Sequence, residues 1–305
     1  MKNIFLTGAT GYLGSVIAEK LKGRGYKVVG LVRNAVGLEK LADKNIELVE
    51  GSLEDLDILI KAANEADAVI HTAFTHNSGN YNENAQLDRD VVKTFGEALL
   101  RTNKPLIITS TSAILGDTGT VDADEDFPFD QNSSRAIRGE TERDMQQMLQ
   151  KGVRAIVLRM PLFIYGRSGS GFVPYMIEQS RKLGSANYIG DGEQLVSAIH
   201  VEDAAELYVA ALETGTAKGV YNAATESVSL KKINQAIARL LNVMAKSISV
   251  EKGLEQFGGM YEFLSKNNQI SADKAKRQIE WSPNSFTTIE DDIENGSYRK
   301  FAIKN

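Results

Sequence analysis

The sequence predicts an α/β protein with a Rossmann-type, doubly wound parallel sheet and a smaller, partly interleaved C-terminal α/β cap domain. In roughly the first half of the chain, short β-branched runs alternate with longer stretches of helical period. The β-branched runs are apolar without alternation, as in strands that are buried on both faces. A glycine-rich segment also joins the first strand to the first helix, which is typical of this fold.

Six parallel strands are expected in the first part of the chain, at residues 4–6, 27–32, 46–49, 68–71, 106–109 and 154–158. Three helices are expected between them, at residues 12–22, 86–101 and 140–150. Gly23 and Gly25 end the first helix, and a polar loop is expected from the fourth strand through Asn84. The first domain is therefore predicted to span residues 1–165.

The texture of the chain changes after Pro161. Glycine-rich loops are expected at 166–171 and 184–192, helices at 204–212 and 230–241, and shorter loops at 258–259 and 266–269. We predict that residues 166–190 and 216–305 form the cap, and that residues 191–215 return to the first domain.

The composition excludes several classes of function. The 305 residues carry a net charge of −5, which argues against a nucleic-acid or anionic-membrane partner. Cysteine is absent, which excludes thiolate catalysis and cysteine metal sites, and the three histidines argue against a histidine-rich site, so no metal is expected. The chain shows neither signal-peptide anatomy nor the about 20 apolar residues of a membrane span. We expect a cytoplasmic monomer or homodimer with a small-molecule substrate.

The glycine-rich segment after the first strand predicts a dinucleotide site. Gly8 permits a tight turn, Gly11 lets the backbone approach a pyrophosphate, and Gly14 lets strand and helix pack closely. The N–H groups at the start of the helix then face the phosphates. The residues expected to bind the cofactor here are Thr7, Gly8, Thr10, Gly11, Tyr12, Leu13 and Gly14. The alternative is a turn without a ligand.

The end of the second strand bears on the choice of cofactor. Arg33 stands 19 residues beyond Gly14, where an acidic side chain would accept a hydrogen bond from the ribose of NAD. A guanidinium suits a 2′-phosphate instead, so NADP is favoured over NAD. The alternative is that Arg33 is a solvated charge at the end of a strand.

Further ordered landmarks extend this pattern over most of the chain. They are Thr7–Gly14, 67–73, 109–112, 159–161 with 165–166, 190–192, 200–204, 221–224 and 281–283. In this order and spacing the chain resembles an extended short-chain dehydrogenase/reductase of the NAD-dependent epimerase/dehydratase family. Residues 171–174 and 188–192 resemble an atypical subgroup of reductases or epimerases.

The resemblance implies further cofactor contacts. Thr72 and Ala73 occupy the family's fourth-strand landmark. The family's Gly-Asp-Leu, whose aspartate contacts adenine, is replaced by Gly51, Ser52 and Leu53. Ser52 keeps one hydroxyl for a hydrogen bond but lacks the two oxygens of a carboxylate.

The family's chemistry implies a Ser/Thr beside a Tyr-xxx-Lys pair, with the phenol as general acid/base. Counting back five residues from Gly116 puts the Ser/Thr position at Thr111, and Ser110 and Ser112 flank it. A one-residue shift would place either serine there instead. The alternative is that these hydroxyls only satisfy backbone groups at the end of a strand.

The Tyr-xxx-Lys pair itself is missing, because no tyrosine occurs between Tyr81 and Tyr165. With Gly152 as the anchor, Ser134 takes the tyrosine position and Arg138 the lysine position. Both are expected at the catalytic centre, on one helical face if the helix starts early enough. Arg138 is expected to contact cofactor or substrate; the alternative is an ion pair with Glu142 at i+4.

The three histidines and Tyr165 are further candidates for the proton carrier. His76 lies in the loop after the fourth strand, where a histidine can move a proton, or where it is simply solvated. His71 is expected to be a satisfied core residue, His200 to order the domain junction, and Tyr165 to be structural. The sequence predicts an NAD(P)-dependent oxidoreductase or epimerase-like enzyme acting on a small carbonyl, hydroxyl or sugar-type substrate. The alternative is a non-catalytic NAD(P)-binding sensor or regulatory protein.

Overall fold

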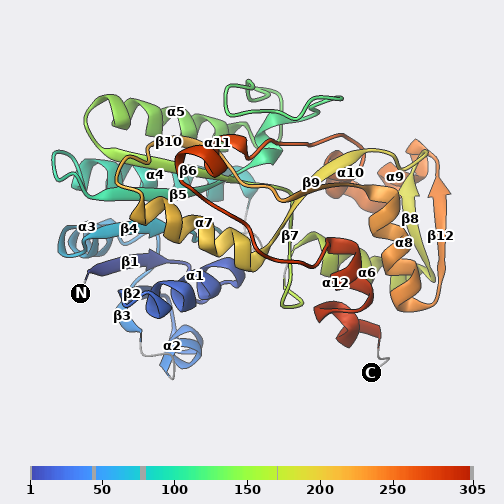
Figure 1. The fold of residues 1–305 in the computed structure, drawn as a ribbon, viewed down its shortest axis with the longest axis horizontal. Helices are drawn as coiled ribbons and strands as arrows, with labels where there is room; N and C mark the ends of the chain where they lie inside the picture. Colours follow the sequence, from blue (N-terminus) through green and yellow to red (C-terminus); the bar gives the residue numbers. More distant parts are fainter. Residues whose placement is uncertain (1, 43–45, 76–79, 170, 303–305) are drawn as a thin grey trace.

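The computed structural model describes residues 2–42, 46–75, 80–169 and 171–302. Its centre is a parallel sheet of seven strands in the order β10-β6-β5-β4-β1-β2-β3. The strands are β1 (Asn3–Thr7), β2 (Lys27–Val32), β3 (Glu47–Glu50), β4 (Ala68–His71), β5 (Pro105–Thr111), β6 (Arg154–Met160) and β10 (Gly219–Asn222). The predicted fold class is confirmed (Figure 1).

Helices cover both faces of this sheet. One face packs against α1 (Tyr12–Gly23), α2 (Ala35–Ala42) and α7 (Val201–Glu213). The other packs against α3 (Leu56–Glu65), α4 (Tyr81–Ala98) and α5 (Ala136–Gln150). Within α1, Val16, Ile17 and Leu21 are buried at helical spacing, so the apolar stripe read from the sequence is the face that meets the strands.

Several boundaries differ from those expected. The helix α4 begins at Tyr81, inside the segment predicted as a loop, because the Asn80 side chain caps it by accepting a hydrogen bond from the Asn82 N–H at 2.9 Å. The helix α5 begins at Ala136 rather than at 140. The strand β10 pairs with β6, so residues 219–222 lie in the large sheet although they fall in the range predicted for the cap.

The remaining elements form two small sheets and their helices. The strands β7 (Phe163–Tyr165), β9 (Leu195–His200) and β11 (Glu226–Ser229) form one sheet, and β8 (Ser185–Ile189) and β12 (Met244–Ile248) form the other. The helices are α6 (Phe172–Leu183), α8 (Leu230–Leu241), α9 (Val250–Phe257), α10 (Tyr261–Leu264), α11 (Asp273–Gln278) and α12 (Ile289–Glu294). Short 3₁₀ helices lie at η1 (Ser112–Leu115), η2 (Gly258–Met260) and η3 (Ser297–Ala302).

The loop predicted at 184–192 is wrong in its centre, where β8 runs. Gly184 is left-handed at the end of α6, and Gly190 and Gly192 follow the strand with positive φ. Between them Ala186 and Ile189 are buried in the apolar cluster of the cap. The glycines therefore mark the two ends of a strand. No helix in the described part of the chain is both long and apolar enough to span a bilayer.

Candidate functional site

The strand order puts a crevice at the carboxyl ends of β1 and β4. The chain leaves β1 toward β2 and β3 and returns on its other side at β4, which makes this the switch point where doubly wound sheets bind ligands. Thr72, after β4, donates its hydroxyl to the Thr7 carbonyl at 2.8 Å. The two segments that the sequence assigned to the cofactor therefore meet here.

The glycine loop has the close contacts that its spacing predicts. Gly8 has a φ of 78°, and a Cβ there would lie 2.6 Å from the Thr72 hydroxyl. A Cβ on Gly14 would overlap the Gly8 carbonyl oxygen. A Cβ on Gly11 would meet only the Gly8 carbonyl oxygen, at 3.1 Å. Gly11 caps α1 without a side-chain hydrogen bond, so the first N–H groups of the helix are open to a phosphate. These residues fit the pyrophosphate of a dinucleotide.

Tyr12 joins this loop to the segment 166–169. Its hydroxyl donates to the Gly166 carbonyl at 2.6 Å, and Gly169 packs so closely on the ring that a Cβ would overlap it. Burial raises the pKa of Tyr12 well above its ordinary value, so the phenol stays neutral. Thr10 and Leu13 are half-buried beside it.

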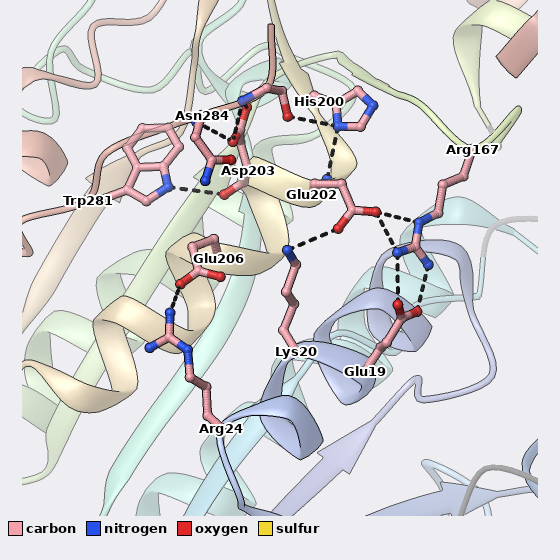
Figure 2. Close-up of polar contacts among 11 residues, drawn as sticks. Glu19, Lys20, Arg24, Arg167, His200, Glu202, Asp203, Glu206, Trp281 and Asn284 are labelled. Atoms are coloured by element: carbon pink, nitrogen blue, oxygen red, sulfur yellow. Dashed lines mark hydrogen bonds and ion pairs between the residues drawn. The ribbon is translucent and has the colours of Figure 1, made fainter. Parts of the chain in front are cut away.

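Arg167 ties that segment to the sheet domain. Its guanidinium donates to Glu19 of α1 at 2.8 Å and to Glu202 of α7 at 2.5 Å (Figure 2). Figure 2 also shows Lys20 reaching Glu202 from α1 at 3.1 Å. Since α1 begins at the glycine loop, these pairs hold the segment 166–169 over that loop.

The residues predicted to surround the adenosine differ in burial and in whether their polar groups already have partners within the protein. Arg33 is exposed, and within the described residues it makes no ion pair or hydrogen bond. The Ser52 hydroxyl donates to Asp55 at 2.8 Å, in the turn that starts α3, and so is engaged within the protein. The Leu53 side chain is buried in the apolar core. Among these three described residues, Arg33 is thus the one whose polar group has no partner.

A buried polar chain runs inward from the end of β1. The Ala73 N–H donates to the Thr7 hydroxyl at 3.3 Å, and that hydroxyl lies 2.7 Å from His71 Nδ1. His71 Nε2 lies 3.1 Å from Asp88 of α4. Both ring nitrogens of His71 therefore have a hydrogen-bond partner within the protein. His71 is therefore a satisfied core residue, as expected.

Arg138 of α5 is the last side chain in this series of buried polar contacts. Its Nε lies 3.6 Å from Asp88, and its Nη2 donates to the Thr109 carbonyl at 2.5 Å. The guanidinium also lies over the Phe74 ring, 4.7 Å from the centroid. The side chain is only 7% exposed. A cation this buried needs its partner charge, and Asp88 supplies it.

The predicted alternative, an ion pair between Arg138 and Glu142, is wrong. Glu142 instead accepts two hydrogen bonds from Arg159 of β6, at 2.7 and 3.2 Å, and Arg159 also donates to Asn222 of β10 at 3.1 Å. Helical spacing allows the first pairing, but the sheet brings a second guanidinium closer. This pair ties α5 to the edge of the sheet.

Of the three hydroxyls at the end of β5, only that of Thr111 is half-buried. It accepts from the Ala113 N–H at 3.2 Å, which leaves its proton for a ligand. Ser112 is fully buried and donates to Asn268 at 2.5 Å. The Ser110 hydroxyl is buried and has no hydrogen-bond partner in the described structure. Thr111 is thus the hydroxyl best placed to meet a substrate.

Ser134 does not share a helical face with Arg138. It precedes α5, is exposed, and donates its hydroxyl to Glu262 of α10 at 2.6 Å. Arg138 points the other way, into the interior. The helix starts too late for the i, i+4 relation that the sequence allowed.

Tyr165 and His200, two further candidates for the proton carrier, are both hydrogen-bonded within the protein. Tyr165 is buried and donates to the Thr287 carbonyl at 2.7 Å, a structural role as expected. His200 caps α7 by accepting from the Glu202 N–H at 3.3 Å, beside Ser285 at 3.1 Å. Burial lowers the pKa of His200, which keeps it a neutral acceptor. Figure 2 shows it at the junction where Asp203 receives the Asn284 N–H. His76 lies outside the described residues.

Four residues near this site were not identified from the sequence: Asp88, Tyr81, Arg135 and Glu262. Asp88 had a signal, because a carboxylate lies on the face of α4 that also carries Val91, Val92 and Phe95. The others had none, since contacts between distant segments place them. In the described part of the chain no group of three or more acidic or histidine side chains is arranged to hold a metal.

Comparison with known proteins gives consistent results. The model of the NAD dependent epimerase/dehydratase family matches residues 4–224. An uncharacterized protein of Schizosaccharomyces pombe is 36% identical over 97% of this chain and 99% of its own, and one of Saccharomyces cerevisiae is 31% identical over 94% and 97%. The crystal structure of dTDP-glucose 4,6-dehydratase from Bacillus anthracis, in complex with NAD, superposes with a TM-score of 0.77 at 18% identity, covering 98% of this chain and 97% of that one.

Proposed function

The chain belongs to the NAD-dependent epimerase/dehydratase family, and on that premise we propose that it is an NADP-dependent oxidoreductase acting on a small carbonyl or hydroxyl compound. The observation that carries the proposal is the glycine loop, whose Gly8 and Gly14 leave no room for side chains while Gly11 leaves its outer side open. The dehydratase structure of the same fold is a complex with NAD, which supports a dinucleotide as the ligand. Arg33, which is exposed and has no partner among the described residues, supports a 2′-phosphate.

The site residues then divide the work. The open N–H groups of α1 hold the pyrophosphate, and Arg33 holds the 2′-phosphate. The bound dinucleotide supplies a hydride. The Thr111 hydroxyl donates a hydrogen bond to the substrate oxygen as negative charge develops on it. Arg138, paired with Asp88 and bonded to the Thr109 carbonyl, fixes the start of α5 against the end of β5.

Cofactor binding is the first test of the proposal. Titration calorimetry with NADP and with NAD should show at least one of them binding with a Kd below about 1 mM, roughly −4 kcal/mol. Folded protein that binds neither would rule the proposal out.

The choice of cofactor depends on Arg33. We expect wild-type protein to bind NADP more tightly than NAD, and Arg33→Asp to lower NADP affinity by about 10- to 100-fold, since hydrogen bonds to a charged group contribute about 1.5–3 kcal/mol. The same calorimetry measures both constants. Arg101→Asp is the control. Arg101 is also exposed, but it lies on the loop after α4, so its replacement should leave the Kd for NADP and the Kd for NAD unchanged. A wild-type preference for NAD would contradict the role of Arg33.

A binding protein that does not turn over is the second candidate. One observation favours it: Ser134, to which the resemblance assigns the tyrosine position, is exposed and bonded to Glu262. Serine has no phenol to exchange a proton near neutral pH. A panel of carbonyl compounds, followed by NADPH absorbance, separates the two, because a sensor binds the cofactor without oxidising it.

A further inference from the structure

We propose that the hydroxyl of Tyr81 is the proton donor of the reaction, in place of the tyrosine that position 134 lacks. The inference rests on the proposed function, because it requires a carbonyl substrate and a hydride donor. Three features carry it: the place of Tyr81 in the fold, the stack of side chains that holds its ring, and its unbonded hydroxyl.

The fold brings Tyr81 to the catalytic edge of the sheet. It is the first residue of α4, which follows β4, so it lies at the same carboxyl edge as Thr111 at the end of β5. The strands β4 and β5 are neighbours. The Asn80 cap fixes the start of the helix and with it the backbone of Tyr81.

A stack of side chains fixes the ring. The Arg135 guanidinium lies over the Tyr81 ring, 3.7 Å from its centroid, and the Phe74 ring lies 5.5 Å away. Phe74 in turn contacts Arg138, so Tyr81 is linked to Arg135 directly and to Arg138 through Phe74, both within the segment 134–138. That is the segment where the Tyr-xxx-Lys pair is missing. The phenol thus comes from α4 instead of α5.

The same stack adjoins a small cavity beside η1. Arg135 also lies over Phe263 of α10, at 4.8 Å, and Phe263 lines the cavity together with Ala113, Gly116 and Glu262. The cavity is therefore lined both by η1, which directly follows Thr111, and by Phe263, which contacts the same Arg135 guanidinium as Tyr81. Within the described residues the Tyr81 hydroxyl makes no hydrogen bond, although the ring is only partly exposed. An oriented hydroxyl without a protein partner is free to meet a substrate.

The charges around Tyr81 decide which direction of proton transfer it favours. Burial raises its pKa above the ordinary value, Arg138 and Arg135 lower it, and Asp88 and Glu262 raise it again. The net direction is upward, so the phenol is protonated at neutral pH. Tyr81 is therefore ready to donate to a carbonyl. The reverse reaction needs its phenolate, so the rate of alcohol oxidation should rise as the pH rises.

The proposed reductive step forms one C–H bond and one O–H bond. A hydride from the reduced nicotinamide forms a C–H bond at the carbonyl carbon while the C=O π bond breaks. The electron pair of that bond takes the proton from the Tyr81 hydroxyl, and water returns a proton to the phenolate. The carbonyl is reduced to an alcohol and the dinucleotide is oxidised.

The first test is Tyr81→Phe, which keeps the ring and its stack and removes only the hydroxyl. For whichever carbonyl compound wild-type protein reduces, we expect kcat to fall by about 10²- to 10⁴-fold, the usual contribution of a general acid, with the Kd for NADPH unchanged. Tyr26→Phe is the matched control, because its hydroxyl bonds Glu213 on the surface. A wild-type kcat in Tyr81→Phe would overturn the inference. The same holds if Tyr81→Phe stays active while His76→Gln loses its activity.

A second measurement does not require turnover. NMR of protein labelled at the tyrosine rings, with the Tyr81 signal assigned by its loss in Tyr81→Phe, should show that signal shifting when NADP is added. Arg135→Met should raise the Tyr81 pKa, since one of the two lowering charges is gone. If NADP binds and the Tyr81 signal does not move, Tyr81 is not at the site. The inference about Tyr81 is then wrong, and the proposed function stands. If NADP does not bind, the proposed function fails instead.

Discussion

Arg159→Met should lower the free energy of unfolding by about 3–5 kcal/mol, because it leaves the Glu142 carboxylate buried without a partner charge. Both side chains are nearly inaccessible, at 4% and 5% exposed. The guanidinium makes two hydrogen bonds to Glu142 and a third to Asn222, so three strong contacts are lost together. Urea unfolding followed by circular dichroism measures the change.

Two further variants show whether the loss comes from the orphaned charge. The double variant Glu142→Met/Arg159→Met should be more stable than Arg159→Met, since replacing both partners of a buried pair by apolar groups is often neutral. Arg24→Met removes one partner of the pairs with Glu206 and Glu213, and Arg24 is 47% exposed. It should cost at most about 1 kcal/mol. Equal losses in Arg24→Met and Arg159→Met would contradict the interpretation.

Thr111→Val should reduce kcat by about 10²- to 10³-fold in the reaction that the protein catalyses, the usual loss when one oriented donor to a developing oxyanion is removed. Valine keeps the shape of threonine, and the Ala113 N–H loses only a weak acceptor at 3.2 Å. The fold should therefore survive, and the Kd for NADPH should not change. Steady-state kinetics and calorimetry on the same preparation measure the two quantities.

Neighbouring hydroxyls provide the controls for Thr111. Ser110→Ala removes a buried hydroxyl that has no hydrogen-bond partner in the described structure, so it should leave kcat near the wild-type value. Ser134→Ala removes an exposed hydroxyl bonded to Glu262 and should have a small effect. Complete loss of activity in Ser134→Ala, with fold and cofactor binding intact, would show that the proton donor has been misassigned.

The order and type of the main elements followed from local patterns. Six apolar runs became parallel strands, and glycine spacing after the first strand correctly predicted a strand–turn–helix unit, because only glycine fits where Gly8 and Gly14 nearly touch. The strand 185–189 was missed because its flanking glycines, which end a helix and turn a strand, have the composition of a loop.

The candidate site was predictable only in part. The glycine loop, Thr111 and the position of Arg33 depend on short stretches of chain, so residue types and spacing suffice to predict them as site residues. The partners of buried charges are not set locally. Glu142 lies four residues from Arg138, yet it pairs with Arg159, because β6 presents that guanidinium under α5 and leaves Arg138 to Asp88.

The sequence by itself therefore determined the fold class, the strand that begins it and the glycine loop between that strand and the first helix, and it shows that no tyrosine lies between Tyr81 and Tyr165. Only the tertiary structure decided that Ser134 faces Glu262, that Asp88 holds Arg138, and that the Arg135 guanidinium lies over the Tyr81 ring. The physical reason is the range of the interactions. Turns and helices depend on neighbours a few residues away, whereas a charge or hydroxyl is partnered by whatever the packed sheet and helices bring within about 3–4 Å.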